Sequence, residues 1–238
     1  MQGKLLIRMA AVGALAGVAI MISVLALSRL GTFGWILSCL LTAAGGAAIT
    51  MLGGHLYAQS ITDDCTGLYN RRYLFRRLEQ EMQHTRRQGL PIALAVIDVD
   101  DFRQYNNRYG HLAGDVVLET VARALRSSVR KGDIVGRWGG EEFALILPGA
   151  DANEALAVTE RVRRQISELI VELGGSCKVR VTISGGVAAS DKHRQITVRE
   201  LIQRADVAMY KAKQQKNKVL PFLETMDTSL QPMHTCGR

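Results

Sequence analysis

The chain has 238 residues, of which 47% are hydrophobic, 22% charged and 5% aromatic. This length allows one or two domains with a substantial core, and the balance of apolar and charged residues excludes an intrinsically disordered chain. The four cysteines, at positions 39, 65, 177 and 236, are too few and too far apart for a disulfide scaffold or a CxxC metal site. A reducing compartment is therefore expected.

Charge is distributed unevenly along the chain. Only three basic residues and no acidic residue precede Asp63, whereas 27 basic and 22 acidic residues occur from Asp63 onwards. Two stretches, Met9–Ser28 and Leu30–Thr62, contain no lysine, arginine or acid. A helix needs about 20 apolar residues to cross a bilayer, so each stretch is long enough. The sequence predicts a membrane part followed by a water-soluble part.

Residues 1–58 are expected to form a membrane anchor with two transmembrane helices, roughly Leu5–Leu27 and Phe33–Tyr57, arranged as a hairpin. Basic residues before the first helix and a charged domain after the second place both ends in the cytoplasm. This predicts a multi-pass protein of the inner (cell) membrane with a cytoplasmic C-terminal domain. A cleaved signal peptide is the alternative; its apolar region is usually about 7–15 residues, shorter than the stretch seen here.

Residues 59–222 alternate between helical and strand patterns, and residues 223–238 are expected to be a flexible tail. Helices are predicted over Arg71–Gln88, from Gly114 onwards, over Ala152–Val171 and over Thr197–Gln215. Strands are predicted over Ile92–Ile97, Ile134–Trp138, Phe143–Leu147, Lys178–Ala188 and Lys218–Phe222. Gly139–Glu142 separates two of these strands and is typical of a hairpin turn. The pattern indicates an α/β fold with a mixed sheet covered by helices.

Carboxylates gather at the ends of two predicted strands. Asp98 and Asp100 follow the Ile92–Ile97 strand two residues apart, a spacing that points both side chains the same way. Glu141 and Glu142 stand at the hairpin tip. If the two strands are neighbours, three or four carboxylates converge, an arrangement that suits a divalent cation and substrate phosphates in phosphoryl or nucleotidyl transfer. The spacing alone equally allows solvated acids in loops.

Four ordered motifs resemble those of the GGDEF family, the diguanylate cyclases that make cyclic di-GMP from two GTP. Gly139–Phe143 (GGEEF) resembles the family signature, and Asp63–Arg72 resembles its opening motif. Asp98–Phe102 follows at the family's spacing, as does the run formed by Asn106, Gly110, His111, Gly114 and Asp115. The resemblance runs from Asp63 to about Leu220 and implies the nucleotidyl-cyclase palm, a ferredoxin-like fold.

The resemblance also implies a Mg²⁺ site, with Mn²⁺ as an alternative ion. Its ligands would be the carboxylates of Asp98 and Glu141 and the carbonyl oxygen of Val99. Glu142 is expected to be the catalytic residue that helps to deprotonate the ribose 3′-hydroxyl. A role as an outer metal ligand or electrostatic partner is the alternative for Glu142.

The resemblance assigns further residues to the GTP substrate. Asn106 and Asp115 are expected to read the guanine edge, since a carboxylate accepts the hydrogen bonds that guanine donates. Glycine leaves room for the backbone to approach the triphosphate. The remaining implied substrate-binding positions are Gly139 and Gly140, Lys213 for the terminal phosphates, and Phe102 as a core residue beside the nucleotide.

Two GTP-loaded subunits must face each other, so the resemblance implies a homodimer. It also implies product inhibition by cyclic di-GMP at a second site formed by Arg130, Asp133 and Arg161, because arginine suits both guanine edges and phosphates. A helix-ending arginine followed by a loop aspartate is the structural alternative. The rival function is a catalytically silent cyclic di-GMP receptor that acts through Arg130 and Asp133.

Four positions depart from the family pattern. Cys65 stands where leucine is common, Arg103 replaces a lysine and Asn107 stands where aspartate is frequent. Lys213–Asn217 is one residue shorter than the family's segment, which predicts weaker triphosphate binding. The pI of about 9.6 does not indicate nucleic-acid binding, because no basic stripe with interleaved aromatics is present. Arginines from Arg71 onwards favour membrane lipid as the nearer partner.

Overall fold

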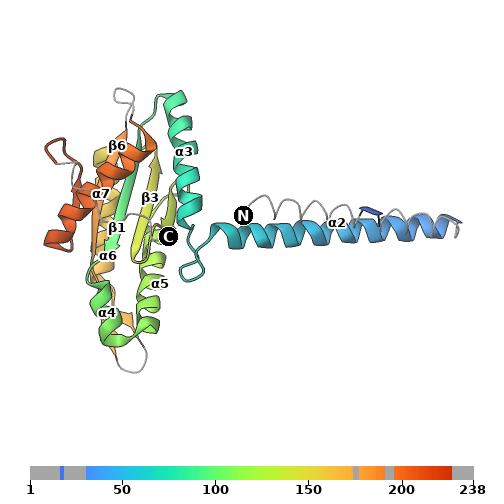
Figure 1. The fold of residues 1–238 in the computed structure, drawn as a ribbon, viewed down its shortest axis with the longest axis horizontal. Coiled ribbons are helices and arrows are strands. Elements are labelled where there is room, and N and C mark those ends of the chain that lie inside the picture. Colours follow the sequence, from blue (N-terminus) through green and yellow to red (C-terminus); the bar gives the residue numbers. More distant parts are fainter. Residues whose placement is uncertain (1–16, 19–30, 174–176, 191–195, 227–238) are drawn as a thin grey trace. The chain divides into compact units, whose positions relative to one another are not determined.

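The computed structural model describes residues 17–18, 31–173, 177–190 and 196–226 (Figure 1). The chain divides into two compact units, Met1–Ser60 and Ile61–Arg238.

The first unit contains most of helix α2, Gly31–Ile61. Its segment Gly31–Met51 has a mean hydropathy of 1.6 and is, within the described residues, the one helix long and apolar enough to cross a membrane. The predicted second span, Phe33–Tyr57, falls inside α2. The predicted first span, Leu5–Leu27, lies outside the described residues except for positions 17 and 18, so the described part offers one apolar helix and not a hairpin.

The second unit is built on a five-stranded sheet with the order β2-β3-β1-β6-β7. All neighbouring strands run antiparallel except β6 and β7, which are parallel. A separate two-stranded sheet pairs β4 with β5. The strands are β1 (Ile92–Val99), β2 (Ile134–Arg137), β3 (Glu142–Pro148), β4 (Val171–Glu172), β5 (Lys178–Val179), β6 (Ile183–Ser190) and β7 (Val219–Pro221).

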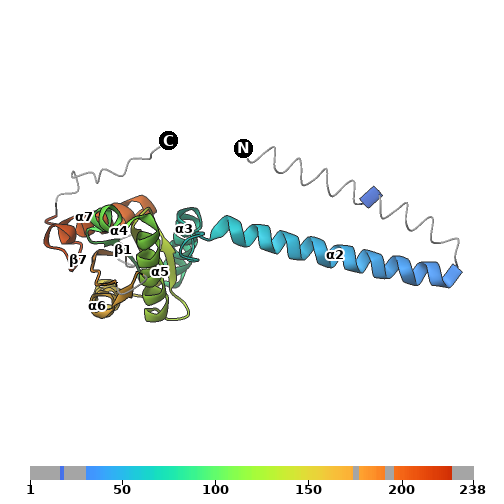
Figure 2. The same ribbon diagram turned by 90° about the horizontal axis from the view of Figure 1, so that it is seen from below.

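Helices cover both faces of the main sheet. Figure 2 shows α5 and α6 on one side and α3 and α7 on the other. The helices are α3 (Arg71–Gln88), α4 (Phe102–Tyr109), α5 (His111–Ser128), α6 (Ala152–Glu168) and α7 (Val198–Gln215). The order β1, helices, β2, β3, α6, β6 is the β-α-β-β-α-β arrangement of ferredoxin-like domains, with the β4–β5 hairpin inserted before β6. The predicted mixed α/β fold is confirmed.

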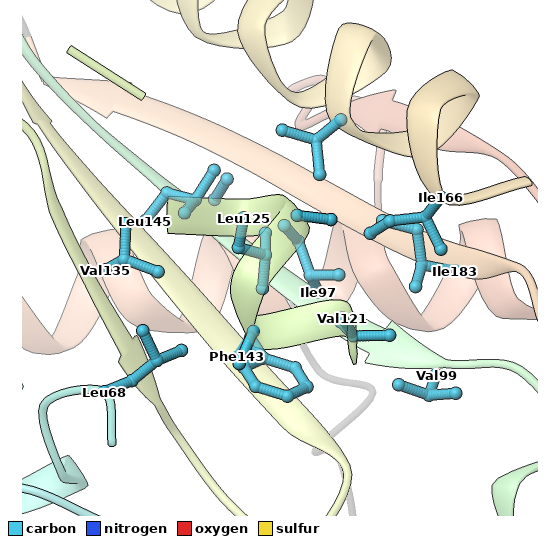
Figure 3. Packing of buried hydrophobic residues seen from close by; sticks show 14 of the residues in the cluster. Leu68, Ile97, Val99, Val121, Leu125, Val135, Phe143, Leu145, Ile166 and Ile183 are labelled. Atoms are coloured by element: carbon cyan, nitrogen blue, oxygen red, sulfur yellow. The ribbon is translucent and has the colours of Figure 1, made fainter. Parts of the chain in front are cut away.

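Two hydrophobic clusters hold these layers together. Strand β1 is buried along its whole length, because its alternate side chains enter opposite clusters. Ile97 belongs to the cluster under α5 and α6, together with Phe143. Figure 3 shows both residues close to Leu125 of α5. Leu94 belongs to the cluster under α3 and α7. The C-terminal end of β1, where Asp98 lies, is therefore fixed by packing on both faces.

Several predicted boundaries were confirmed and others were wrong. Helix α3 has the predicted ends, with Asn70 capping its start and Gly89 in the left-handed conformation at its end. Helix α4 was missed, since Phe102 is its only buried residue and it gives a weak periodic signal.

The predicted strand Lys178–Ala188 is broken, because β5 pairs with β4 whereas β6 joins the main sheet. Val171 pairs with Val179 in that small sheet. Helix α6 therefore ends at Glu168 and not at the predicted Val171.

Candidate active site

Strands β1 and β3 are neighbours, and their register places Asp98 opposite Glu142. Asp98 is only 2% exposed, and its Oδ2 accepts a hydrogen bond of 2.8 Å from Lys213 Nζ. Burial raises the pKa of Asp98 to about 7; Lys213 opposes this, while the nearby charges of Glu141 and Glu142 add to it. The predicted gathering of Asp98 with both glutamates is thus present as a local excess of negative charge.

Asp100 does not add a fourth carboxylate to this group. It is 4% exposed and accepts hydrogen bonds from Thr182 Oγ1 (2.6 Å), Ser184 Oγ (2.7 Å) and the backbone N–H of Asn217 (2.8 Å). These donors come from the start of β6 and from the α7–β7 turn. Asp100 consequently joins three parts of the chain and has its oxygens occupied.

The hairpin tip is held by Arg137, a residue that sequence reasoning missed. Its guanidinium donates to the carbonyl oxygens of Gly139 (3.2 Å) and Gly140 (2.6 and 3.0 Å). It also forms two hydrogen bonds, of 3.0 and 3.1 Å, to the carboxylate of Asp63. Its position two residues before Gly139, together with the acid that opens the Asp63–Arg72 motif, is the signal that could have revealed this contact.

Gly139 lies against the side chain of Glu142. A Cβ atom at Gly139 would lie 2.6 Å from Glu142 Oε2, whereas a Cβ at Gly140 would meet nothing within 4 Å. The carboxylate of Glu142 therefore occupies the space that a larger residue at Gly139 would fill. The structure gives Gly140 a role through its carbonyl oxygen, which binds Arg137.

The expected metal ligands are compatible with a divalent ion. Asp98 Oδ1 is buried and has no hydrogen-bond partner among the described residues, so one oxygen is left for a further ligand. The Val99 N–H donates to the Glu141 carbonyl oxygen at 3.2 Å. This hydrogen bond holds the end of β1 against the hairpin tip, so the two expected ligands Val99 and Glu141 are neighbours. No group of three or more His, Cys, Asp or Glu side chains within the described ranges could hold a metal by itself. Two carboxylates are nevertheless sufficient for Mg²⁺, which takes its remaining ligands from water and phosphate.

A second unpartnered oxygen lies at the expected base site. Asn106 Oδ1, on α4, is buried without a hydrogen-bond partner in the described part of the chain. A Cβ at Gly114 of α5 would lie 2.0 Å from this oxygen and 3.1 Å from Phe102 Cζ, so glycine is what admits the Asn106 side chain. Asp115 follows directly, and its Oδ1 lies 3.8 Å from the Cys65 sulfur. Phe102 is 8% exposed and belongs to the core cluster, as expected.

The three residues of the expected inhibitory site line one cleft of about 360 Å³. Arg130 donates to Asp133 Oδ1 at 3.1 Å and to the Pro148 carbonyl oxygen at 2.8 Å. Arg161, on α6, donates to the Ser128 carbonyl oxygen at 2.7 Å. The structure thus brings Arg161 of α6 together with the loop that carries Arg130 and Asp133.

A sequence model of the family described as "Diguanylate cyclase, GGDEF domain" matches residues 60–219. This match covers more than half of the chain, and the chain belongs to the GGDEF family.

Curated relatives with this domain include three named diguanylate cyclases. "Diguanylate cyclase A" of Treponema denticola is 36% identical over 73% of this chain and 47% of its own length. DgcP of Pseudomonas aeruginosa is 38% identical over 65% of this chain and 23% of its own length. DosC of Escherichia coli K12 is 36% identical over 66% of this chain and 34% of its own length. The chain therefore spans less than half of the length of these relatives.

Solved structures show the same fold. The diguanylate cyclase SiaD of Pseudomonas aeruginosa, in complex with its activator SiaC, is 35% identical with a TM-score of 0.66, over 92% of this chain and 85% of that one. The GGDEF domain of DgcB from Caulobacter crescentus, in complex with c-di-GMP, is 29% identical with a TM-score of 0.65, over 68% and 93%. The active GGEEF domain of a diguanylate cyclase from Vibrio cholerae is 26% identical with a TM-score of 0.61, over 66% and 98%.

Proposed function

We propose that this protein is a diguanylate cyclase, which condenses two GTP into cyclic di-GMP and two pyrophosphates. One observation carries the proposal: the described residues leave two buried side-chain oxygens unpartnered, Asp98 Oδ1 and Asn106 Oδ1. Such atoms are costly in a folded protein and are typical of sites where a ligand completes the hydrogen bonding. These two atoms lie in the motifs expected to bind metal and base. The Vibrio cholerae domain described as active also carries a GGEEF sequence.

The phosphate end of the site depends on Asp98, Glu141 and the Val99 carbonyl, which would hold Mg²⁺. When bound, such an ion neutralises phosphate charge and polarises the α-phosphate. Burial, with a contribution from the two glutamates, raises the pKa of Asp98, and a bound cation would favour the charged form of this carboxylate. Lys213, which donates to Asp98, would release that hydrogen bond and bind the terminal phosphates.

At the other end of the nucleotide, Asn106 and Asp115 would recognise guanine. Asp115 accepts hydrogen bonds, and the amide of Asn106 both donates and accepts. Adenine presents a different set of donors and acceptors, so this pair favours GTP. Gly140, where a Cβ atom would meet nothing within 4 Å, and Gly139 would let the backbone of the hairpin tip approach the triphosphate, and Phe102 would support the base site from the core.

The reaction joins the ribose 3′-oxygen of one GTP to the α-phosphorus of another and breaks the bond to pyrophosphate. Glu142 is the residue that we assign to removing the 3′-hydroxyl proton. Its carboxylate lies next to Gly139, opposite Asp98 in the strand register. Since each GTP supplies both a nucleophile and an electrophile, two subunits must meet face to face, and the active species is a homodimer.

Product inhibition is the expected role of the cleft lined by Arg130, Asp133 and Arg161. Two guanidinium groups beside a carboxylate suit the phosphates and guanine edges of cyclic di-GMP. The same cleft supports the second candidate function, a receptor that binds cyclic di-GMP without making it.

The apolar part of α2 supports membrane attachment. Gly31–Met51 has the length and hydropathy of a membrane span, and large apolar side chains such as Phe33 and Trp35 are exposed on it. We propose that residues 1–58 anchor the protein as a two-helix hairpin in the inner membrane, with the catalytic domain in the cytoplasm and membrane lipid around the anchor.

The test is product formation by the full chain in detergent or nanodiscs, incubated with GTP and Mg²⁺. A phosphodiesterase that removes cyclic di-GMP relieves feedback, and mass spectrometry identifies the products. Glu141→Ala should make no cyclic di-GMP. Glu79→Ala, which removes an exposed carboxylate on α3, is the matched control and should behave as the unsubstituted protein. If the unsubstituted protein makes no product but binds cyclic di-GMP, the cyclase proposal is wrong and the receptor function takes its place.

A further inference from the structure

Three non-glycine residues of the described chain have positive φ angles: Asp101 at 56°, Lys216 at 53° and Asn217 at 46°. Such a conformation is unfavourable for residues with a Cβ atom, although Asn and Asp tolerate it better than most. Residues held in this way cluster at functional sites, where surrounding contacts maintain them. Although separated by more than a hundred positions in sequence, Asp101 and Lys216 are in direct contact.

Contacts between the end of β1 and the α7–β7 turn maintain these conformations. Lys216 Nζ lies 2.8 Å from both carboxylate oxygens of Asp101. The Asn217 N–H donates to Asp100 Oδ2 at 2.8 Å, and Arg163 Nη1 of α6 donates to Asn217 Oδ1 at 2.6 Å. Two consecutive residues of the turn, Lys216 and Asn217, therefore each bind one of the two aspartates that follow β1.

The Asp101–Lys216 ion pair joins the N-terminal end of α4 to the C-terminal end of α7. Asp101 directly precedes α4, the helix that carries Asn106, yet its side chain makes no capping hydrogen bond to that helix. Its Oδ1 accepts a hydrogen bond of 3.3 Å from the Gln104 side chain of α4, and both of its carboxylate oxygens bind Lys216, three residues after Lys213. Through this pair, the start of the base-reading helix and the segment assigned to the terminal phosphates are held in a fixed relation.

We propose that Asp101 and Lys216 are positioning residues for GTP, and that Lys216 acts through Asp101 and does not contact the phosphates. The proposal rests on the proposed function, since it assigns a role within the same nucleotide site. The geometry supports it because both carboxylate oxygens of Asp101 lie within hydrogen-bond distance of the Lys216 ammonium. A lysine engaged in this way stabilises the turn in which the shorter Lys213–Asn217 segment ends.

A double-mutant cycle tests this role. Asp101→Asn, Lys216→Gln and the double variant are compared by steady-state kinetics with GTP. Binding of a GTP analogue with a methylene group in place of the α,β-bridging oxygen is measured alongside. Each single variant should raise KM and the analogue Kd about two- to fivefold, the range of a partly exposed ion pair, with kcat nearly unchanged. The double variant should be no worse than either single variant, and Lys216→Arg should restore the native values.

Changes of the analogue Kd in opposite directions for Asp101→Asn and Lys216→Gln would overturn the proposal. If Lys216 contacts the triphosphate, Asp101→Asn frees it and lowers the analogue Kd, while Lys216→Gln raises it. Independent, additive effects would overturn it as well. Lys211→Gln, which removes another lysine near the end of α7, is the control and should leave KM unchanged. If the unsubstituted protein forms no cyclic di-GMP, the proposed function fails, and the analogue Kd values still decide whether the ion pair positions the nucleotide.

Discussion

The two buried aspartates at the end of β1 differ in how their oxygens are satisfied. Asp100 has three hydrogen-bond donors from β6 and the α7–β7 turn. Asp98 has a single donor from the described residues, Lys213, and its second oxygen has none. Burial costs a carboxylate a great deal unless hydrogen bonds or charges compensate. Asp100 is therefore compensated within the fold, whereas Asp98 is left for a ligand to compensate.

Asn106 extends this comparison to a second region. Like Asp98, it keeps a buried oxygen without a partner among the described residues, and it lies in a motif assigned to GTP. The buried oxygens without a hydrogen-bond partner thus lie on Asp98 and Asn106, the proposed metal and base positions. The fully hydrogen-bonded Asp100 instead connects β1 with β6 and the α7–β7 turn. Substitutions in the two groups should consequently separate activity from stability.

The largest effect is expected for Asp98→Asn. If Asp98 binds the metal as proposed, its loss removes several kcal/mol of charge stabilisation in the transition state, so cyclic di-GMP formation should fall more than about 100-fold. The melting temperature should stay the same or rise, because the variant no longer buries a carboxylate whose pKa is raised to about 7 by desolvation. The assay measures initial rates and thermal unfolding of the same preparations.

Asp64→Asn, at an exposed aspartate, is the control for that experiment and should change neither quantity. A marked loss of stability in Asp98→Asn would show that Asp98 is a structural residue like Asp100.

Asp100→Asn should show the reverse pattern, with a loss of stability as its primary effect. The neutral amide of asparagine accepts weaker hydrogen bonds than a carboxylate. Its NH2 group would also face the N–H and O–H donors that now bind the Asp100 carboxylate. The expected loss of unfolding free energy is about 2–3 kcal/mol. Urea unfolding followed by circular dichroism measures it. An Asp100→Asn protein with native stability and no activity would instead place Asp100 in the catalytic machinery.

The sequence predicted the Ile92–Ile97 strand and the hairpin that carries Glu141 and Glu142, because buried strands and a glycine turn leave strong signals. Whether the two are neighbours stayed open until the structure showed β1 paired with β3. Spacing alone did not distinguish Asp98 from Asp100, since it is the same whichever one finds donors, and only the family resemblance singled out Asp98. The donors of Asp100 lie on Thr182, Ser184 and Asn217, more than eighty residues away. Contacts of that range, including Arg137 with Asp63, depend on strand order and turn conformation, which periodicity does not encode.

Gly114→Ala tests the base-reading region without touching a hydrogen-bonding group. The new Cβ would lie 2.0 Å from Asn106 Oδ1, so the amide must rotate away from its present position. Loss of one hydrogen bond to the base should raise the KM for GTP about tenfold, with a smaller change in kcat. Gly132→Ala is the matched control, because a Cβ there meets nothing within 4 Å. An unchanged KM in Gly114→Ala would separate Asn106 from guanine recognition.

The smallest effect is expected where a carboxylate is already well compensated, at Asp63. Burial alone would raise the pKa of Asp63, but hydrogen bonds from Thr66 and from Arg137, together with the Arg137 charge, lower it below its usual range. A lowered pKa in the folded state means that the carboxylate stabilises the fold above the unfolded pKa, about 4, and loses this contribution as pH falls through the folded value.

Asp63→Asn should therefore lower the unfolding free energy by about 1 kcal/mol at pH 7. The difference from the unsubstituted protein should shrink as the pH falls from about 4 through the lowered pKa of folded Asp63, because below that pKa both proteins carry a neutral side chain at this position. Thermal unfolding of both proteins between pH 3 and 7 measures the difference. A gap that stays constant over this range would mean that the Asp63 charge does not contribute. The hairpin tip would then depend on Arg137 and the carbonyl oxygens of Gly139 and Gly140 alone.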